Sequence, residues 1–308
     1  MANPLTNVGT NTGAYGPAEW SLTFTIGLIW GSAFLWIALG VDHLSPGVVA
    51  FGRVALGSIA LATFSRARRR VAREDWARIL AVAVFGNAAP ALLFAIAETE
   101  LDSAVAGMIT SGTPILSLVV AGVMMRSLPP RTQAAGISVG FVGIVLMTLP
   151  SLRGANAAPA GVVLVLVATV GYAISGNLLV PLQQRYGGPA VTLWALGLSS
   201  VVLAPFAVAT VAESDFTLGS VVAVLILGIV GTGIARSLAA TLAGRAGAPR
   251  MSTTTYLVPV VAIVLGVTFR NETVTPIAVA GVALVLAGAI IASRAISNNP
   301  AAVTRSSS

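Results

Sequence analysis

The chain has 308 residues, of which 56% are hydrophobic and only 9% are charged, and its mean hydropathy is +0.93. Water-soluble domains carry about 25% charged residues, so this composition excludes an ordinary soluble surface. The formal net charge of +7 comes from scattered Arg residues that form no basic face, which argues against a nucleic-acid partner. With no Cys and a single His, His43, the sequence predicts no disulfide, no metal and no cofactor.

Ten apolar segments account for most of the chain, and each approaches the length of about 20 residues that a helix needs to cross a bilayer. They cover residues 21–40, 47–65, 77–97, 103–125, 133–150, 160–181, 189–211, 218–241, 251–269 and 275–293. The polar segments at the two ends, 1–20 and 294–308, are expected to be disordered. This pattern predicts an all-α integral membrane protein with ten transmembrane helices.

The Arg residues orient these segments, because Arg is retained on the cytoplasmic side of a membrane. Segment 65–73 holds five of the 17 basic residues, all of which are Arg, as in the proteins of a GC-rich bacterium. With this segment inside, seven other loop or tail Arg residues fall inside as well, and just two, Arg153 and Arg270, fall outside. The sequence therefore predicts a multi-pass protein of a bacterial inner membrane with both termini in the cytoplasm.

A repeat divides the chain into two halves, 21–150 and 160–293. Four residues recur at a spacing of 145 without any gap, namely Gly86, Pro114, Gly136 and Gly143 against Gly231, Pro259, Gly281 and Gly288. Five segments per half is an odd number, so the second half is expected to enter the membrane in the inverted direction. Inverted repeats are typical of transporters, whose binding site near the membrane midplane opens to either side in turn. Duplication that yields only a stable helical bundle is the alternative.

Short motifs in several segments resemble those of EamA-type proteins, which belong to the drug/metabolite transporter superfamily. The motifs are Trp30-Gly31-Ser32-Ala33-Phe34, Ser111-Gly112-Thr113-Pro114, Tyr256-Leu257-Val258-Pro259 and the Gly-rich segments 136–143 and 281–288. The resemblance covers about residues 21–293 and implies two five-helix repeats that export or exchange small metabolites or drugs without ATP hydrolysis. Family members often carry a Gly-Glu or similar pair at the ends of the fourth and ninth helices. Here the second half has Asn271-Glu272, whereas the first half has Arg126-Ser127.

Two Arg residues, Arg53 and Arg236, lie within the predicted spans, where a charge is costly and suggests a function. Arg53 lies about seven residues from the outer end of its segment, and we consider it a candidate for binding a substrate carboxylate. A structural tie to helix-end carbonyls is the alternative. Arg236 lies nearer the cytoplasmic end, where a long side chain can also reach the membrane interface.

Further candidates for a substrate pocket are aromatic and small polar side chains of the spans: Trp30, Phe34, Tyr172, Trp194, Tyr256, Ser32, Asn87 and Asn177. Aromatic residues in membrane bundles commonly pack or line the interface instead, and a serine commonly bonds its own helix backbone. The two Asn residues are stronger candidates, because an amide in lipid needs a partner or a ligand.

Proline and glycine residues within the spans predict kinks and close helix contacts. Pro90, Pro114 and Pro259 remove backbone donors and are predicted to form gating kinks. The pairs Gly136/Gly143 and Gly281/Gly288 place two small residues on nearly one helix face, which predicts tight packing within the chain or between protomers.

Together these features predict a secondary transporter that exports amino acids or related small metabolites, as a monomer or a homodimer in the lipid bilayer. Multidrug efflux or metabolite uptake by the same fold is the alternative, and an integral-membrane enzyme fits least, since the spans hold no catalytic cluster. No acidic residue lies in the middle of a span. Glu98 and Glu100, at the outer end of the third segment, are the nearest candidates for proton coupling, and we expect them to be solvated loop charges.

Overall fold

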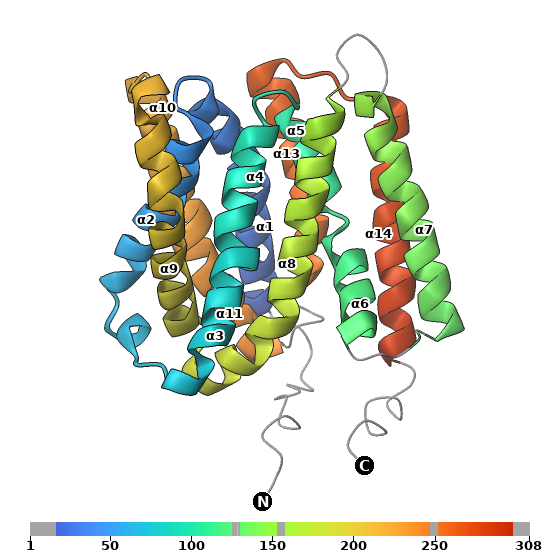
Figure 1. The fold of residues 1–308 in the computed structure, drawn as a ribbon. Helices are drawn as coiled ribbons and strands as arrows, with labels where there is room; N and C mark the ends of the chain where they lie inside the picture. Colours follow the sequence, from blue (N-terminus) through green and yellow to red (C-terminus); the bar gives the residue numbers. More distant parts are fainter. Residues whose placement is uncertain (1–16, 125–127, 129, 153–157, 247–251, 298–308) are drawn as a thin grey trace, which may run out of the picture.

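The computed structural model describes residues 17–124, 128, 130–152, 158–246 and 252–297, and all regular elements within them are helices (Figure 1). The long helices are α1 (Pro17–Val41), α2 (Pro46–Ala62), α7 (Arg131–Thr148), α8 (Pro159–Tyr186), α9 (Gly188–Thr210) and α14 (Pro276–Ser297). Shorter helices are α3 (Trp76–Ala83), α4 (Ala89–Ala97), α5 (Ser103–Thr110), α6 (Thr113–Met124), α10 (Leu218–Ile226), α11 (Ala235–Ala246) and α13 (Val258–Arg270). Of the ends expected to be disordered, 1–20 and 294–308, residues 1–16 and 298–308 lie outside the described residues. The expectation is wrong for residues 17–20 and 294–297, because α1 begins at Pro17 and α14 continues to Ser297.

Within the described part of the chain, seven helical segments are long and apolar enough to cross a membrane: Pro17–Val41, Arg73–Ala97, Ser103–Val120, Arg131–Leu152, Pro159–Leu179, Gly188–Glu213 and Leu218–Ala239. Three shorter apolar helices, Pro46–Ala62, Thr254–Arg270 and Pro276–Ala292, accompany them. Large apolar side chains such as Ile59, Val201 and Phe206 stand exposed on the outside of the bundle. In water such a surface would aggregate, whereas in a bilayer the lipid tails cover it. The protein is therefore a multi-pass membrane protein.

The two ends of the bundle differ in their loops. α1 begins and α14 ends at the end where segment 65–73 also lies, and we call this the Arg-rich end (Figure 1). The opposite end, called the far end below, carries the connections 98–102, 211–217 and 271–275. Every charged side chain in these three connections is acidic.

Several spans are interrupted rather than continuous. Two π-helical segments, Val84–Ala88 and Leu227–Ile234, separate α3 from α4 and α10 from α11. The segment expected as one span over 103–125 ends its first helix at Thr110 and starts again at Thr113, because Pro114 lacks an N–H group and disfavours helical geometry in the residue before it. Pro90 and Pro259 likewise lie in the first turn of α4 and α13. Each proline of the predicted kinks thus lies where a helical segment begins.

The contact between α7 and α14 depends on four glycines of the same chain. A Cβ atom on Gly143 would lie 2.6 Å from both the Gly281 carbonyl oxygen and the Val285 nitrogen, and a Cβ on Gly136 would lie 2.7 Å from the Gly288 carbonyl oxygen. Since the two backbones touch, any side chain at these positions would force the helices apart. The predicted packing glycines therefore meet in pairs within the chain.

We expect Gly143→Ala to lower the free energy of unfolding by about 1–3 kcal/mol through overpacking, although Ala is the better helix former. Gly176→Ala in α8 is the matched control, because a Cβ there would meet nothing within 4 Å. Thermal unfolding in detergent measures both variants. A Gly143→Ala protein as stable as the Gly176→Ala protein would contradict the close helix contact.

Candidate functional site

The two π-helical segments are built alike. Asn87 donates its side-chain amide to the Val82 carbonyl oxygen at 3.1 Å, and Thr232 donates its hydroxyl to the Leu227 carbonyl oxygen at 2.9 Å. In both cases the acceptor lies five residues earlier, and both donor and acceptor are related by the spacing of 145 residues. A wider turn leaves backbone groups to be satisfied by side chains, and such turns are frequent at functional sites.

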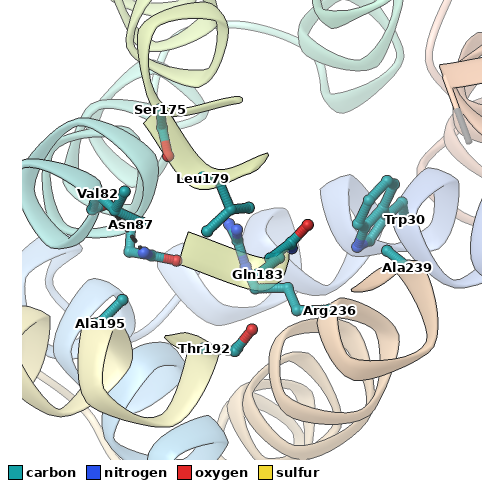
Figure 2. A pocket seen from close by; sticks show the side chains of 10 residues that line it. All are labelled: Trp30, Val82, Asn87, Ser175, Leu179, Gln183, Thr192, Ala195, Arg236 and Ala239. Carbon is teal, nitrogen blue, oxygen red and sulfur yellow. Dashed lines mark hydrogen bonds between the residues drawn. The ribbon is translucent and has the colours of Figure 1, made fainter. Parts of the chain in front are cut away.

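A pocket lies beside the first of these segments, in the half of the bundle toward the Arg-rich end (Figure 2). Its cavity volume is about 70 Å³ and it is open on one side, so in this closed form it is smaller than most small-molecule sites. α1, α3, α8, α9 and α11 contribute to its wall together with the π segment. The lining residues are Trp30, Val82, Asn87, Ser175, Leu179, Gln183, Thr192, Ala195, Arg236 and Ala239.

Arg236 supplies a positive charge to this pocket. Its Nη2 donates to the Gly86 carbonyl oxygen at 3.1 Å, and its guanidinium lies over the Tyr172 ring at 5.8 Å from the centroid. Figure 2 shows the side chain projecting between Asn87 and Trp30. No acidic side chain of the described residues pairs with it. Its positive charge is thus not compensated by a carboxylate of the described residues, which favours an anionic group of a ligand in this pocket.

Asn87 supplies an acceptor to the same pocket. The residue is 4% exposed, and its Oδ1 atom has no hydrogen-bond partner among the described residues, although its nitrogen is bonded to Val82. A buried polar atom without a partner is unfavourable by about 1–3 kcal/mol. This oxygen is therefore suited to a donor that the chain itself does not provide.

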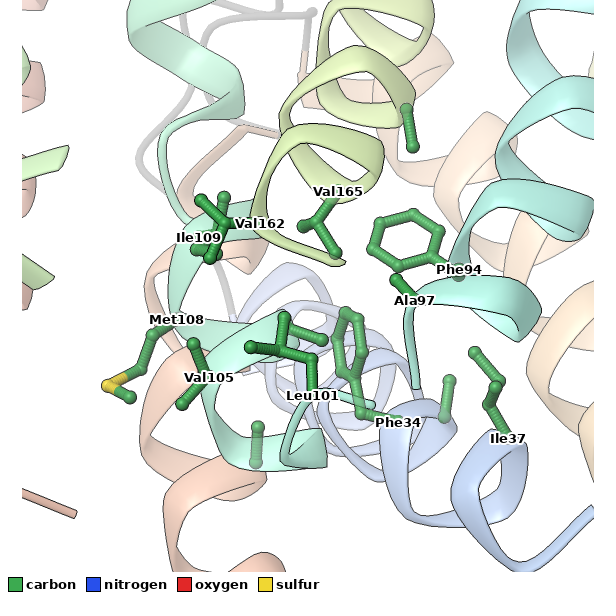
Figure 3. Packing of buried hydrophobic residues seen from close by; sticks show 14 of the residues in the cluster. Phe34, Ile37, Phe94, Ala97, Leu101, Val105, Met108, Ile109, Val162 and Val165 are labelled. Atoms are coloured by element: carbon green, nitrogen blue, oxygen red, sulfur yellow. The ribbon is translucent and has the colours of Figure 1, made fainter. Parts of the chain in front are cut away.

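Aromatic side chains close the pocket on the side of the far end. Tyr172 stacks on Phe94 at 5.9 Å, and Phe94 meets Phe34 edge-on at 5.6 Å. Phe34 and Phe94 belong to a large buried cluster that also contains Leu101 and Val105, between α1, α4, α5 and α8 (Figure 3). This packed layer separates the pocket from the far end.

Polar contacts hold the far end closed. Asn271 ends α13 in a left-handed conformation and turns the chain back, so that Glu272 reaches the start of α5. The Glu272 carboxylate accepts from the Ser103 nitrogen at 3.0 Å, the Ser103 hydroxyl at 2.7 Å and the Ala104 nitrogen at 2.8 Å. Arg270 also binds Asp42, which follows α1. A charged residue thus caps a helix of the other half of the chain.

Arg53 lies outside the pocket wall. It is 8% exposed, and its Nε donates to the Thr232 hydroxyl at 3.0 Å, whereas its Nη1 has no partner among the described residues. Arg53 in the first half therefore binds the π segment of the second half, and Arg236 in the second half binds the π segment of the first.

The other candidates from the sequence lie elsewhere. Ser32 donates to the Ile29 carbonyl oxygen of its own helix, and Asn177 donates to the Ala173 carbonyl oxygen and more weakly to that of Ser117 in α6. Trp194 donates to the Arg69 carbonyl oxygen at the Arg-rich end. The pocket lining also excludes Phe34, Tyr172 and Tyr256, although the Tyr172 ring lies under the Arg236 guanidinium. Of the predicted set, the pocket brings together Trp30, Asn87 and Arg236.

Sequence reasoning missed Ser175, Gln183 and Thr192, which also line the pocket. One signal was present, because Ser175 lies 145 residues after Trp30 and is therefore its equivalent in the second half. Gln183 lies near the last residue of α8 and Thr192 near the first residue of α9, where a polar residue in the sequence indicates a loop.

Comparisons with known proteins agree with these features. The model of the EamA-like transporter family matches residues 19–149 and again 159–294. An uncharacterized transporter of Archaeoglobus fulgidus is 28% identical, covering 90% of this chain and 99% of its own. A probable terminal-alkyne amino-acid exporter of Streptantibioticus cattleyicolor is 27% identical, covering 90% and 93%. A probable amino-acid metabolite efflux pump of Salmonella typhimurium is 24% identical, covering 88% and 93%.

The fold also matches a known crystal structure. The TM-score is 0.65 with 17% sequence identity, and the match covers 92% of this chain and 99% of the other. At this identity the match concerns the fold alone.

We expect Glu272→Ala to open the far end, because three hydrogen bonds to a carboxylate are lost, each of which contributes about 1.5–3 kcal/mol. The probe is a cysteine at Leu101, which is 5% exposed, in a chain that has no other Cys. Its labelling by a maleimide should become at least about tenfold faster. Glu213→Ala, which removes an exposed acid at the same end, should leave the labelling rate unchanged.

Proposed function

The chain belongs to the EamA-like transporter family, and on this premise we propose that it exports α-amino acids and closely related metabolites across a bacterial inner membrane by alternating access. As a secondary transporter it moves a small molecule without hydrolysing ATP. The observation that carries the substrate class is the pocket in which Arg236 and the unpartnered oxygen of Asn87 lie together. Two of its relatives are described as amino-acid exporters or efflux pumps, which supports the same class.

An α-amino acid carries a carboxylate and an ammonium group, and this pocket offers a partner for each. Its carboxylate fits the uncompensated charge of Arg236, since a guanidinium binds a carboxylate through charge-assisted hydrogen bonds. Its ammonium group fits Asn87 Oδ1, an acceptor that is otherwise buried without a partner. Trp30, Leu179 and Ala239 leave apolar wall for a side chain. The shape and charge of the pocket thus favour a zwitterion.

The second half of the chain supports this assignment of the ammonium group. Thr232 is the equivalent of Asn87 at the spacing of 145 residues, and its hydroxyl oxygen accepts from the cationic Nε of Arg53. The equivalent of Arg53 is Leu198 of the second half, so the second half offers Asn87 no cation at the equivalent position. We infer that the ammonium group of the substrate donates to Asn87 Oδ1, as Arg53 Nε donates to the Thr232 hydroxyl.

The membrane arrangement is part of the proposal. We propose ten transmembrane helices in two inverted repeats, 21–150 and 160–293, in which the three shorter apolar helices also cross. The pairing of equivalent elements supports this, because each π segment packs against the first two helices of the opposite half. With the Arg-rich end in the cytoplasm, the pocket faces inward and the far end is the closed outer gate. Pro90, Pro114 and Pro259 then lie at the bends where the two halves change shape.

Multidrug efflux and metabolite uptake are the alternatives within the same fold. Many drugs that efflux pumps remove are organic cations, and Arg236 would repel them from this pocket. Uptake differs from export in the direction of the gradient, and the pocket favours the same zwitterion in both cases.

We expect Arg236→Met to reduce transport of amino acids by about 10- to 100-fold in kcat/KM, because a hydrogen-bonded charge contributes roughly 1.5–3 kcal/mol. Arg236→Lys should retain part of the activity, since it keeps the charge but loses the planar fork. Counterflow of labelled amino acids in liposomes measures both, and Arg70→Met, which changes an exposed Arg, is the control. Equal transport by Arg236→Met and Arg70→Met would remove Arg236 from the site.

Asn87 permits a second test that uses the chain's own repeat. Asn87→Val should abolish the preference for an amino acid over its deaminated analogue, because no acceptor remains for the ammonium group. Asn87→Thr should keep most of that preference, since Thr232 shows that a hydroxyl can bond the carbonyl five residues earlier and accept from a cation at once. The ratio of the two transport rates measures this. A ratio that Asn87→Val leaves unchanged would contradict the assignment.

A further inference from the structure

Glu98 is a buried acidic residue at the far end of the bundle. It follows the last residue of α4 and is 7% exposed, and neither oxygen of its carboxyl group has a hydrogen-bond partner among the described residues. The expectation that Glu98 and Glu100 are both solvated loop charges is therefore wrong for Glu98, whereas Glu100 is exposed. The reason is tertiary packing, since the residues around Glu98 belong to one closely packed cluster.

The ionised form of this carboxyl group is unfavourable in the closed structure. An ionised carboxylate buried without a partner costs several kcal/mol, and a neutral carboxyl group costs much less. Glu98 also lies at the C-terminal end of α4, where the partial negative charge of the helix opposes an anion. Burial accordingly raises the pKa of the Glu98 carboxyl group well above its usual value, and the nearby charge of Arg53 opposes this effect.

Three charged side chains act on Glu98 from the neighbouring elements, and two of them are already engaged. Arg270 binds Asp42, and Glu272 caps α5. Arg53 of α2 is the third, and its Nη1 atom is without a partner, as are both oxygens of Glu98. Arg53 is thus the cation that would compensate an ionised Glu98, at the expense of its bond to Thr232 in the π segment.

Opening of the far end would bring water to Glu98 and return its pKa toward the ordinary value of about 4.3. The closed form then binds one proton more than the open form. We propose that Glu98 is a proton-binding site of the far end, which takes up one proton from the adjoining medium when this end closes and releases it when this end opens. The proton moves between water and the carboxylate, and no other group changes its charge.

The direction of the pH effect follows from the sign of the shift. The pKa is raised in the closed form, so the closed form gains stability at low pH and loses it as the pH rises through that raised value. A single proton changes the ratio of open to closed form by at most about tenfold per pH unit. The far end should therefore open more often as the medium becomes less acidic.

The test uses the Leu101→Cys protein in nanodiscs and a maleimide between pH 5 and pH 8, without any substrate. Each labelling rate is divided by that of the same cysteine in the Leu101→Cys, Glu98→Gln protein, which removes the pH dependence of the thiol. We expect the ratio to rise by about three- to tenfold per pH unit over part of this range. Glu100→Gln, which changes an exposed acid two residues away, should leave that rise intact.

A ratio that is flat across this range, or a rise that Glu100→Gln abolishes, would overturn the proposal. Arg53→Met supplies an independent readout if the Glu98→Gln protein does not fold. Removal of the Arg53 charge should move the pH at which the rise in labelling levels off to a higher value, whereas a structural role of Arg53 would change the rate equally at every pH. Because no substrate is present, failure of this test leaves the proposed amino-acid export untouched, and failure of the transport assay leaves this test valid.

Discussion

The bundle depends on one constraint, which is that a bilayer interior offers no water to a backbone carbonyl that loses its helical partner. The two π segments meet this constraint with side chains, Asn87 for the Val82 carbonyl and Thr232 for the Leu227 carbonyl. The widened turns present further groups to the rest of the bundle. The Gly86 carbonyl oxygen binds Arg236, and the Thr232 hydroxyl binds Arg53. Buried Arg53 and half-buried Arg236 are thus each held by a π segment of the opposite half, and the pocket takes its position from this crossed arrangement.

The two π segments share one backbone arrangement, but their side-chain acceptors have different partners. In the second half the acceptor is the Thr232 hydroxyl oxygen, which already accepts from Arg53 Nε of the same chain. In the first half the acceptor oxygen of Asn87 is left open at the pocket. A difference between a filled and an open copy of one arrangement is a stronger indication of a ligand than an unpaired oxygen alone, because the filled copy shows what kind of donor fits.

The sequence predicts much of the scaffold and less of the site. The apolar segments and the spacing of 145 residues are visible directly, and the glycines of α7 and α14 follow from their spacing on one helix face. The π segments are not visible, because a widened turn arises from contacts with other helices, such as the approach of Gly171 to the Phe85 carbonyl. Glu98 reads as a loop charge since its burial depends on packing between distant segments. Arg236 was recognisable as a charge within a span, but its hydrogen-bond acceptor, the Gly86 carbonyl oxygen, lies 150 residues away in the sequence.

The buried charges also bear on which substrates the bundle tolerates. Buried Arg53 and half-buried Arg236 contribute two positive charges to the described bundle, and Glu98 is neutral in the closed form that we infer. An organic cation would add a third positive charge to a medium in which like charges repel strongly. A zwitterion adds none, and in the proposed binding mode its carboxylate meets Arg236 and its ammonium group meets Asn87. The same interior that makes an isolated charge costly therefore favours a substrate whose two charges cancel, provided that each finds its partner on the pocket wall.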